Sequence, residues 1–325
     1  MKLSYTQTQK YLFCSEQWKL HYQEKIRSTF VGSPLFFGNA CDEAFNNLLL
    51  SVEGNKDEGE KVFLDNFKTF RYNKQDLELK SSPLVTYSNT DFDKDILLDE
   101  DLKKLNKKYE VEDVFAFFEE AKDLKRKGLL KGEDLLLFNY MCWLSLKRKG
   151  IMLVQAYREL VLPEIHKVYG VQVPVKLPNE TGDTYTGFID AVVSFKDAPN
   201  VKVVVDNKTS SKPYKEDSVS TSEQLASYCE YLEIEDAAYI VAEKNIRKRE
   251  PRVRISIIRD KIKEEVFDSV FYEIDSVLKG INNNEFEKNF DSGCFQYGQR
   301  CPYFDLCRGS DDMKGLVNLN EKSKK

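Results

Sequence analysis

The sequence contains little that would place the protein in a membrane, on a secretory route or among nucleotide-driven motors. No apolar run approaches the roughly 20 residues of a membrane-spanning helix. The first residues, Met-Lys-Leu-Ser-Tyr, lack the apolar segment and the small-residue cleavage site of a secretory signal. No Gly-x-x-x-x-Gly-Lys-Ser/Thr loop for nucleotide phosphates is present. We therefore expect a cytoplasmic protein with no membrane partner and no motor of its own.

The chain also lacks an excess of positive charge. Its 49 Lys and Arg are outnumbered by 54 Asp and Glu, which gives a formal net charge of -5. This excludes a protein that coats nucleic acid by bulk charge, but it leaves room for a local basic groove. The richest basic run lies at 244–249 and contains Arg247, Lys248 and Arg249. It predicts either a solvated loop or a rim that contacts phosphates.

Length and composition are those of a globular protein. The chain has 325 residues, of which 41% are hydrophobic, enough for one large domain or two modest ones. Patterning divides it into N-terminal helices at 1–50, a charge-rich helical insertion at 51–150, the main α/β core at 151–285, and a cysteine-bearing segment with a tail at 286–325. Within the first segment, a second helix is predicted to begin at Gly38.

Residues 151–285 predict a mixture of strands and helices. The apolar stretch Ile151–Leu162 fits either type of element. Beyond it, β-branched runs and amphipathic spacing predict strands at Val171–Leu177, Tyr185–Phe195, Val201–Val205, Ala237–Ala242 and Val253–Ile258, and helices at Glu223–Leu232 and Lys261–Leu278. Asp-Ala-Pro-Asn at 197–200 predicts the turn of a hairpin. Gly280 predicts the end of the last helix.

Two acids and a lysine fall on that hairpin. Asp190 closes the segment Gly-Phe-Ile-Asp, and Asp206 ends the next strand and is followed two residues later by Lys208. Because neighbouring strands lie about 4.8 Å apart, both carboxylates can reach one Mg²⁺ ion, which prefers oxygen ligands. Two acids, a metal-activated water and an ammonium suit hydrolysis of a phosphodiester. The alternative is that the acids cap strands and that Lys208 forms an ordinary salt bridge.

These segments resemble the PD-(D/E)XK nuclease superfamily in its RecB-like branch. Asp206 matches the second acidic position of the motif, with Asp in place of the commoner Glu, Asn207 the variable position, and Lys208 the lysine. The branch also carries a glutamine and a tyrosine four residues apart on the following helix, which Gln224 and Tyr228 match. At that spacing both side chains share one helical face and could touch a DNA backbone.

The resemblance implies a restriction-endonuclease-like α/β core, in which a central mixed β-sheet is flanked by helices. It implies Mg²⁺ or Mn²⁺ as the cofactor of catalysis. The catalytic residues that it implies are Asp190, Asp206, Lys208, Gln224 and Tyr228.

One position departs from the family pattern. The branch often has a histidine in an N-terminal helix, a few residues after a glycine, where this chain has Asp42 after Gly38. Neither His21 nor His166 falls at that place. Since aspartate also binds Mg²⁺ and Mn²⁺, the resemblance implies a metal site made of Asp42, Asp190, Asp206 and Asn207. Glu159 is a further candidate acid.

The C-terminal segment places three cysteines, Cys294, Cys301 and Cys307, within fourteen residues. Seven cysteines in a cytoplasmic chain are not expected to form disulfides, so this spacing indicates metal binding. A tetrahedral site needs a fourth ligand, and zinc and iron–sulfur clusters both accept four thiolates. Some members of the RecB-like branch, such as AddB-type helicase–nucleases and CRISPR-associated exonucleases, join one early and three late cysteines around a 4Fe-4S cluster. That resemblance implies Cys14 as the fourth ligand; the other cysteines, Cys41, Cys142 and Cys229, are expected in the core.

The function implied by the resemblance is that of a metal-dependent deoxyribonuclease, of exonuclease type, in DNA end processing during recombination, repair, phage replication or CRISPR adaptation. Its expected partners are single-stranded DNA or duplex ends, and a separate helicase or recombination protein. Arg247, Lys248 and Arg249 are then the candidate DNA-binding residues. The alternative is a DNA-binding or scaffold protein that keeps the fold but has weak or no cleavage, for which Asp42 in place of the histidine is the main support.

Overall fold

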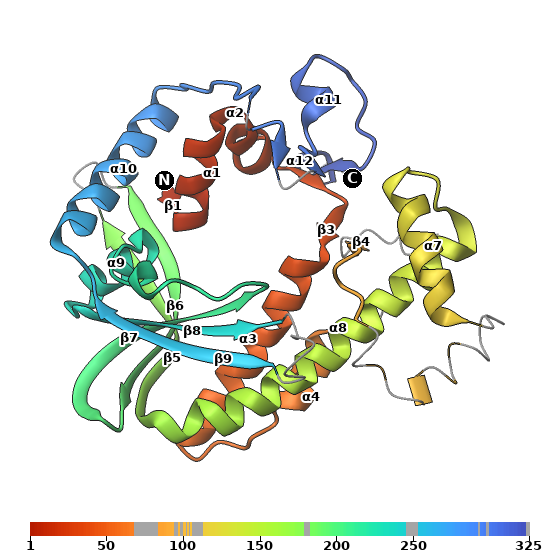
Figure 1. The fold of residues 1–325 in the computed structure, drawn as a ribbon. Coiled ribbons are helices and arrows are strands. Elements are labelled where there is room, and N and C mark those ends of the chain that lie inside the picture. The colour runs from red at the N-terminus through yellow and green to blue at the C-terminus, as the bar shows by residue number, and fades with distance from the viewer. Residues whose placement is uncertain are drawn as a thin grey trace.

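The computed structural model describes residues 1–67, 84–93, 97, 100, 101, 103, 105, 113–178, 183–244, 253–291, 293–296 and 299–322. Its centre is a six-stranded mixed sheet in the order β1-β6-β7-β8-β9, with β5 paired to β6 (Figure 1). The strands are β1 (Lys2–Leu3), β5 (Ile165–Pro178), β6 (Thr184–Phe195), β7 (Ala198–Ser210), β8 (Asp236–Glu243) and β9 (Arg254–Lys261). β1 runs parallel to β6 and β7 parallel to β8, whereas the other pairs are antiparallel.

The sheet is buried on both faces by helices, which gives the expected α/β architecture (Figure 1). One face packs against α3 (Ser33–Val52), α4 (Gly59–Asn66), α7 (Val114–Arg126) and α8 (Gly132–Leu160) in a single apolar cluster. The other packs against α1 (Tyr5–Phe13), α9 (Glu223–Leu232) and α10 (Glu264–Asn282) in a second cluster. β8 alternates strictly between the two clusters, which is why its Ala-Ala-Tyr-Ile-Val-Ala run is apolar throughout.

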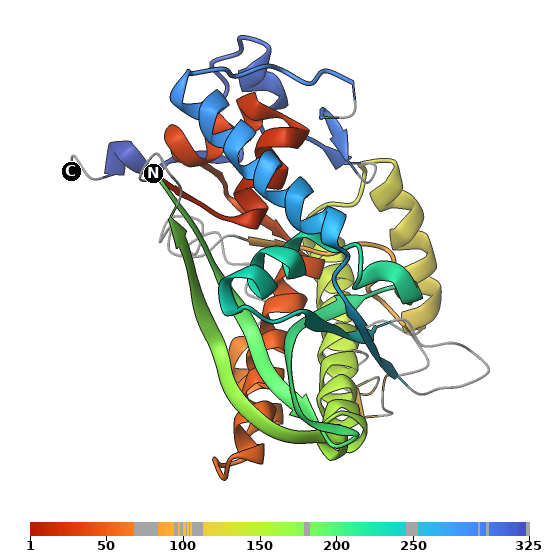
Figure 2. The same ribbon diagram turned by 90° about the vertical axis from the view of Figure 1, so that its left-hand side faces the viewer.

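Short elements at the two ends of the chain lie beside each other. β2 (Ile26–Ser28) pairs antiparallel with β12 (Leu316–Asn318). The nearby N-terminal helix is α2 (Ser15–Trp18), and the C-terminal segment adds β10 (Phe295–Gln296), β11 (Gln299–Arg300), α11 (Phe304–Cys307) and α12 (Leu319–Lys322). β3 (Phe30–Gly32) pairs in parallel with β4 (Leu84–Thr86). Figure 2 shows the C-terminal segment lying over α1 and α2, beyond the end of the long β5–β6 ribbon.

The predicted hairpin is confirmed, but its turn and its end differ from the prediction. The turn is Lys196–Asp197, and β7 already begins at Ala198, because Phe195 pairs with Ala198 across a two-residue loop. β7 also does not end at Asp206. It continues to Ser210, because its other edge pairs with β8 from Val204 to Ser210, beyond the last pair with β6 at Val205.

Two helix predictions are corrected, and one open alternative is settled. Ile151–Leu162, which fitted either a helix or a strand, lies almost wholly within α8, a 29-residue helix that crosses the expected segment boundary at 150. α3 begins at Ser33 and not at Gly38, because Pro34 fits the first turn of a helix. Gly280 does not end α10; a Cβ there would lie 2.2 Å from the Tyr11 hydroxyl oxygen, so this glycine allows α1 to pack closely.

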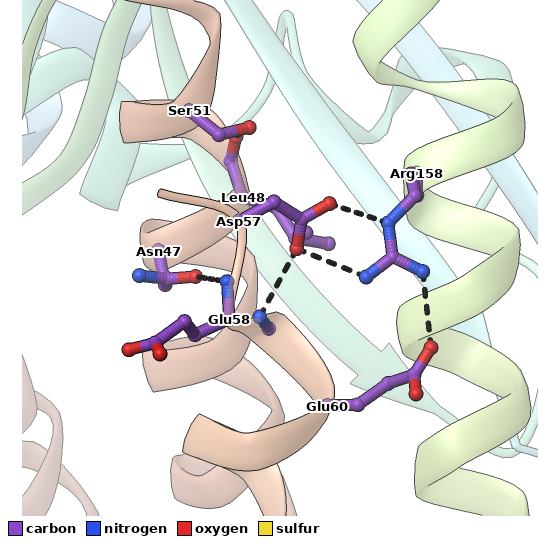
Figure 3. A network of polar contacts seen from close by, with 8 residues as sticks. Asn47, Leu48, Ser51, Asp57, Glu58, Glu60 and Arg158 are labelled. Atoms are coloured by element: carbon purple, nitrogen blue, oxygen red, sulfur yellow. Dashed lines mark hydrogen bonds and ion pairs between the residues drawn. The ribbon is translucent and has the colours of Figure 1, made fainter. Parts of the chain in front are cut away.

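An ion-pair network joins α8 to the connection between α3 and α4 (Figure 3). The Arg158 guanidinium on α8 donates to both carboxylate oxygens of Asp57 at 2.6 and 2.9 Å and to Glu60 at 3.0 Å. Asn47 Oδ1 on α3 accepts the Glu58 amide at 2.9 Å. These contacts fix the short α3–α4 connection against the long helix that runs under the sheet. Among the helices within the described ranges, none is long and apolar enough to cross a membrane.

The packing of α8 against α4 predicts that Gly150→Ala destabilises the protein. The added Cβ would lie 1.9 Å from Cζ of Phe63, whose side chain is fully buried. Overpacking of this kind costs about 1–3 kcal/mol and opposes the gain of about 1 kcal/mol from replacing glycine in a helix. We expect a lower urea midpoint, and a smaller loss when Gly150→Ala is made in a Phe63→Leu background. A gain of stability for Gly150→Ala alone would contradict this packing.

Candidate active site

The site begins where two strands of the sheet separate. β6 pairs with β1 at Thr184 and Tyr185, and with β7 only from Ala191 onward. In the part of the chain that the structure describes, no strand pairs with β6 along that edge between these two regions. Asp190 is the last residue of the separated stretch of β6, next to the first pair with β7, and its Oδ2 accepts the backbone N–H of Asn207 at 2.8 Å. The carboxylate thus replaces a strand-to-strand hydrogen bond at the opening.

Alternation along β7 places Asp206 and Lys208 on the same side of the strand. Asp206 is buried, with 3% of its surface exposed, and its Oδ2 lies 2.5 Å from the Lys208 ammonium. Lys208 also donates to Oε1 of Gln224 on α9 at 3.1 Å. Gln224 in turn donates to the hydroxyl of Tyr228 at 3.2 Å. The sequence forms α9 here because Ser222 accepts the Leu225 amide as an N-terminal cap.

α3 brings a third acid to the opening. Gly38 allows this helix to approach β7, since a Cβ there would lie 3.2 Å from the Thr209 hydroxyl oxygen. One turn further along, Asp42 accepts a long hydrogen bond of 3.4 Å from Asn46 on Oδ2, while its Oδ1 is buried and has no hydrogen-bond partner among the residues that the structure describes. A buried, unpartnered carboxylate oxygen is costly unless a cation or donor satisfies it.

These side chains surround one cavity of about 360 Å³. It is lined by Pro34, Leu35, Gly38, Asn39, Asp42, Phe45, Asp190, Asp206, Asn207, Lys208, Thr209 and Gln224. Burial, together with the Asp206 carboxylate, raises the pKa of Asp42 to about 6. Burial and the Asp206 and Asp42 charges hold the pKa of Asp190 well above its usual range. Although burial opposes it, the Asp206 carboxylate raises the pKa of Lys208.

The donor set of the cavity fits a divalent cation. Three carboxylates face a single ammonium, and Mg²⁺ and Mn²⁺ prefer such oxygen ligands. As the side chains stand within the described ranges, no group of three or more His, Cys, Asp or Glu is placed so that it could hold a metal ion. Lys208 engages Asp206 and the Asn207 amide engages Asp190 in this arrangement.

Most of the residues predicted from the sequence therefore meet. The cavity collects Asp42, Asp190, Asp206, Asn207, Lys208 and Gln224. Tyr228 lies behind Gln224, 5% exposed, against Gly187 of β6. Glu159 is exposed on α8 and is not among the residues that line the cavity. The basic run Arg247, Lys248 and Arg249 lies outside the described residues.

Two further residues, which were not predicted from the sequence, contact the site. Tyr157 of α8 is fully buried, donates to Oδ1 of Asn207 at 3.0 Å, and stacks on Phe45 with 4.3 Å between ring centroids. Gln172 of β5 has a left-handed backbone (φ 51°), and its amide donates to Oδ1 of Asp190 at 3.4 Å. Helical periodicity could have placed Tyr157 on the buried face of α8, whereas a glutamine in left-handed conformation leaves no signal in the sequence.

The cysteines predicted to act together also line one cavity, smaller than the first. Cys14 contributes from the α1–α2 junction, and Cys294, Cys301 and Cys307 from the C-terminal segment. All four are free thiols. The Cys301 amide donates to the Cys294 carbonyl at 2.9 Å, and the Gln17 amide donates to Cys301 Sγ at 3.3 Å. Burial raises the pKa of Cys301, and the nearby Cys14 and Cys294 add to that rise. The remaining cysteines, Cys41, Cys142 and Cys229, are confirmed as core residues.

Comparison with known proteins identifies the family of the chain. No curated protein sequence matches the chain. Among solved structures, a crystal structure of SSO0001 matches at 15% identity with a TM-score of 0.24, over 36% of this chain and about half (51%) of that one, a likeness too slight to support an argument. The family model of the PD-(D/E)XK nuclease superfamily matches residues 2–308, and the expected mixed sheet flanked by helices is confirmed. The chain therefore belongs to the PD-(D/E)XK nuclease superfamily.

Proposed function

We propose that this protein is a metal-dependent deoxyribonuclease that hydrolyses phosphodiester bonds, and that it acts as an exonuclease on DNA ends. One observation carries the proposal. In a chain of this superfamily, Asp42, Asp190 and Asp206 converge with Lys208 on one cavity. The excess of buried negative charge there is what a divalent cation would neutralise.

The roles of the residues follow from their positions. Asp190 and Asp206, helped by Asp42 and the Asn207 carbonyl, would hold Mg²⁺ or Mn²⁺. The cation supplies Lewis-acid stabilisation of the charge that develops on the phosphate. The oxygen of a water molecule bonds to phosphorus and gives up a proton to solvent, while the P–O bond to the leaving nucleotide breaks and the leaving oxygen takes up a proton.

Lys208 and α9 complete the proposed machinery. The Lys208 ammonium stabilises negative charge on the non-bridging phosphate oxygens, and its contacts with Asp206 and Gln224 hold it in place. Gln224 lines the cavity and orients the strand. Tyr228 is buried behind it, so its hydroxyl acts on the strand through Gln224.

The proposed setting is DNA end processing in recombination, repair, phage replication or CRISPR adaptation, which is the work of the RecB-like branch. Since the chain carries no nucleotide-phosphate loop, a separate helicase or recombination protein is the proposed partner. Arg247, Lys248 and Arg249 remain proposed DNA contacts.

We further propose that Cys14, Cys294, Cys301 and Cys307 hold a 4Fe-4S cluster. Four free thiols that line a single cavity supply the donor set of a four-thiolate centre, which the thiols would have to draw together to bind, since they are not close enough in the described arrangement. Such a centre would join the α1–α2 junction to the C-terminal segment. Because it closes a loop of nearly the whole chain, its loss would reduce stability as well as activity.

The competing function is DNA binding without cleavage, favoured by Asp42 in place of the family histidine. Asp42 nevertheless presents a carboxylate to the same cavity as Asp190 and Asp206. Binding of labelled DNA without cleavage under Mg²⁺, Mn²⁺ and EDTA alike would favour the scaffold.

For the enzyme, we expect Asp190→Asn to abolish cleavage in Mg²⁺ or Mn²⁺ while DNA binding persists. In the folded protein, the pKa of the Asp190 carboxyl is raised above its value of about 4 in the unfolded chain. The free energy of unfolding therefore falls as pH rises above about 4, because the unfolded chain gives up this proton more readily than the folded one. Asp190→Asn should therefore raise the melting temperature of the EDTA-treated protein at pH 8 more than at pH 4. The control is Asp197→Asn, an exposed acid on the same hairpin, which should leave cleavage unchanged. Full activity of Asp190→Asn would refute the proposed site.

Tyr157→Phe tests the contact that holds Asn207. The substitution keeps the ring on Phe45 and removes only the hydroxyl that donates to Asn207. Loss of one buried hydrogen bond costs about 0.5–1.5 kcal/mol of stability. We also expect Tyr157 to position Asn207 in the motif, so that its loss lowers kcat and raises the Mg²⁺ concentration needed for the half-maximal rate. Asn207→Ala made in the Tyr157→Phe protein should then add little, because both changes break one contact. Additive losses with unchanged metal dependence would leave Tyr157 a purely structural residue.

Cluster binding is tested by anaerobic purification. We expect a brown protein with about four irons and four sulfides per chain. Cys14→Ser and Cys307→Ser should each lose the colour and lower the melting temperature, whereas Cys229→Ala, in the core, should keep the colour. A colourless protein with one zinc ion per chain would contradict the proposed cluster and indicate a zinc site instead. The proposal for the acidic cavity would be unaffected.

A further inference from the structure

Aromatic rings and guanidinium groups alternate on the surface of the C-terminal segment. Arg308 lies over the rings of Phe290 and Phe304, at 5.4 and 4.3 Å from their centroids, and Arg300 lies over Phe304 at 4.0 Å. Phe295 packs against Phe304 with 5.6 Å between centroids. We call these five residues the aromatic–arginine row. Its members stack on one another but do not enter the two large apolar clusters of the fold.

The row is exposed in a way that isolated surface residues are not. Phe290 is 51% exposed and Phe295 is 59% exposed. Single exposed apolar side chains are common, but adjacent rings held by cations form an accessible stacking surface. A groove of about 600 Å³ opens beside Phe290 and is lined by Lys288, Phe290, Cys307, Arg308 and Gly309.

The charge of this groove is opposite to that of the whole chain. Among the described residues, its lining holds two cations and no carboxylate, although the formal net charge of the protein is -5. Arg300 pairs with Asp305, but in the described ranges no ion pair holds Lys288 or Arg308. Lys288 instead donates to the Cys307 carbonyl at 2.6 Å, which keeps its ammonium at the groove. A ligand with both anionic groups and flat apolar faces would satisfy the cations and the rings together.

We propose that the aromatic–arginine row and its groove bind single-stranded DNA. Unpaired bases stack on the exposed rings of Phe290 and Phe295, and Lys288 and Arg308 contact the phosphates. A duplex hides its base faces in its own stack, so this surface selects a single-stranded end over a blunt one. The inference rests on the proposed function in taking DNA as the substrate, and it specifies which form of DNA the enzyme engages.

The test is equilibrium binding of the full-length protein, with its cysteine centre intact, to fluorescent single-stranded and blunt duplex oligonucleotides in EDTA. We expect Phe290→Ala to weaken single-strand binding about 5- to 150-fold, the effect of losing one base–ring stack. Phe290→Tyr, which keeps the ring, should restore it. Arg308→Ala should reduce the salt dependence by about one phosphate contact. Duplex affinity should change little in all three variants.

Two controls match these changes at other places. Tyr272→Ala removes a ring on α10 that is 78% exposed. Arg259→Ala removes an arginine of β9 whose guanidinium lies 4.4 Å from the centroid of the Phe195 ring. Both variants should bind single strands like the parent protein. Unchanged single-strand affinity of Phe290→Ala and Arg308→Ala, with cleavage intact, would overturn the proposal and leave the nuclease in place. If a variant lost affinity for single strands and for duplex DNA to the same extent, the proposed preference for single-stranded ends would be wrong. A parent protein that neither binds nor cleaves DNA would instead reject the proposed function itself.

Discussion

The separation of β6 from β7 creates the acidic cavity on which the proposed chemistry depends. Paired strands satisfy their backbone groups with each other, so a sheet has no room for a polar site until two strands part. Here β7 loses its pairing with β6 after Val205 but stays paired with β8 on its other edge, and the Asp190 carboxylate takes over as acceptor for the Asn207 amide. The same event places Asp206 and Lys208 beyond the hairpin, where their side chains face an opening instead of a neighbouring strand.

The opening concentrates like charge inside the protein. Asp42, Asp190 and Asp206 are each partly or wholly buried, and each has a raised pKa because burial disfavours the charged form. Lys208 offsets one of the three charges. The remaining imbalance reduces the stability of the folded chain, which is the expected relation between a site built to attract a cation and the scaffold that contains it.

Contacts between distant segments keep this arrangement in place. Two neighbouring residues of α8 make different contacts. Tyr157 donates to the Asn207 side chain, and Arg158 forms ion pairs with the α3–α4 connection. α3 is thereby fixed on the side from which Asp42 enters the cavity. At the other end of the molecule, the pairing of β2 with β12 brings Cys14 and the late cysteines to one cavity.

The sequence by itself determined the hairpin, the helix Glu223–Leu232 and the core strand β8, because alternation, turn residues and helical spacing are local signals. Strand pattern also indicated Asp190 and Asp206, and spacing indicated the three late cysteines, whereas Asp42 and Cys14 were named only through the resemblance to a family. Only the tertiary structure decided where β6 and β7 part, how far β7 extends, and that Tyr157 and Gln172 touch the motif. These features depend on strand partners and helix packing far apart in the chain, and a local pattern carries no record of them.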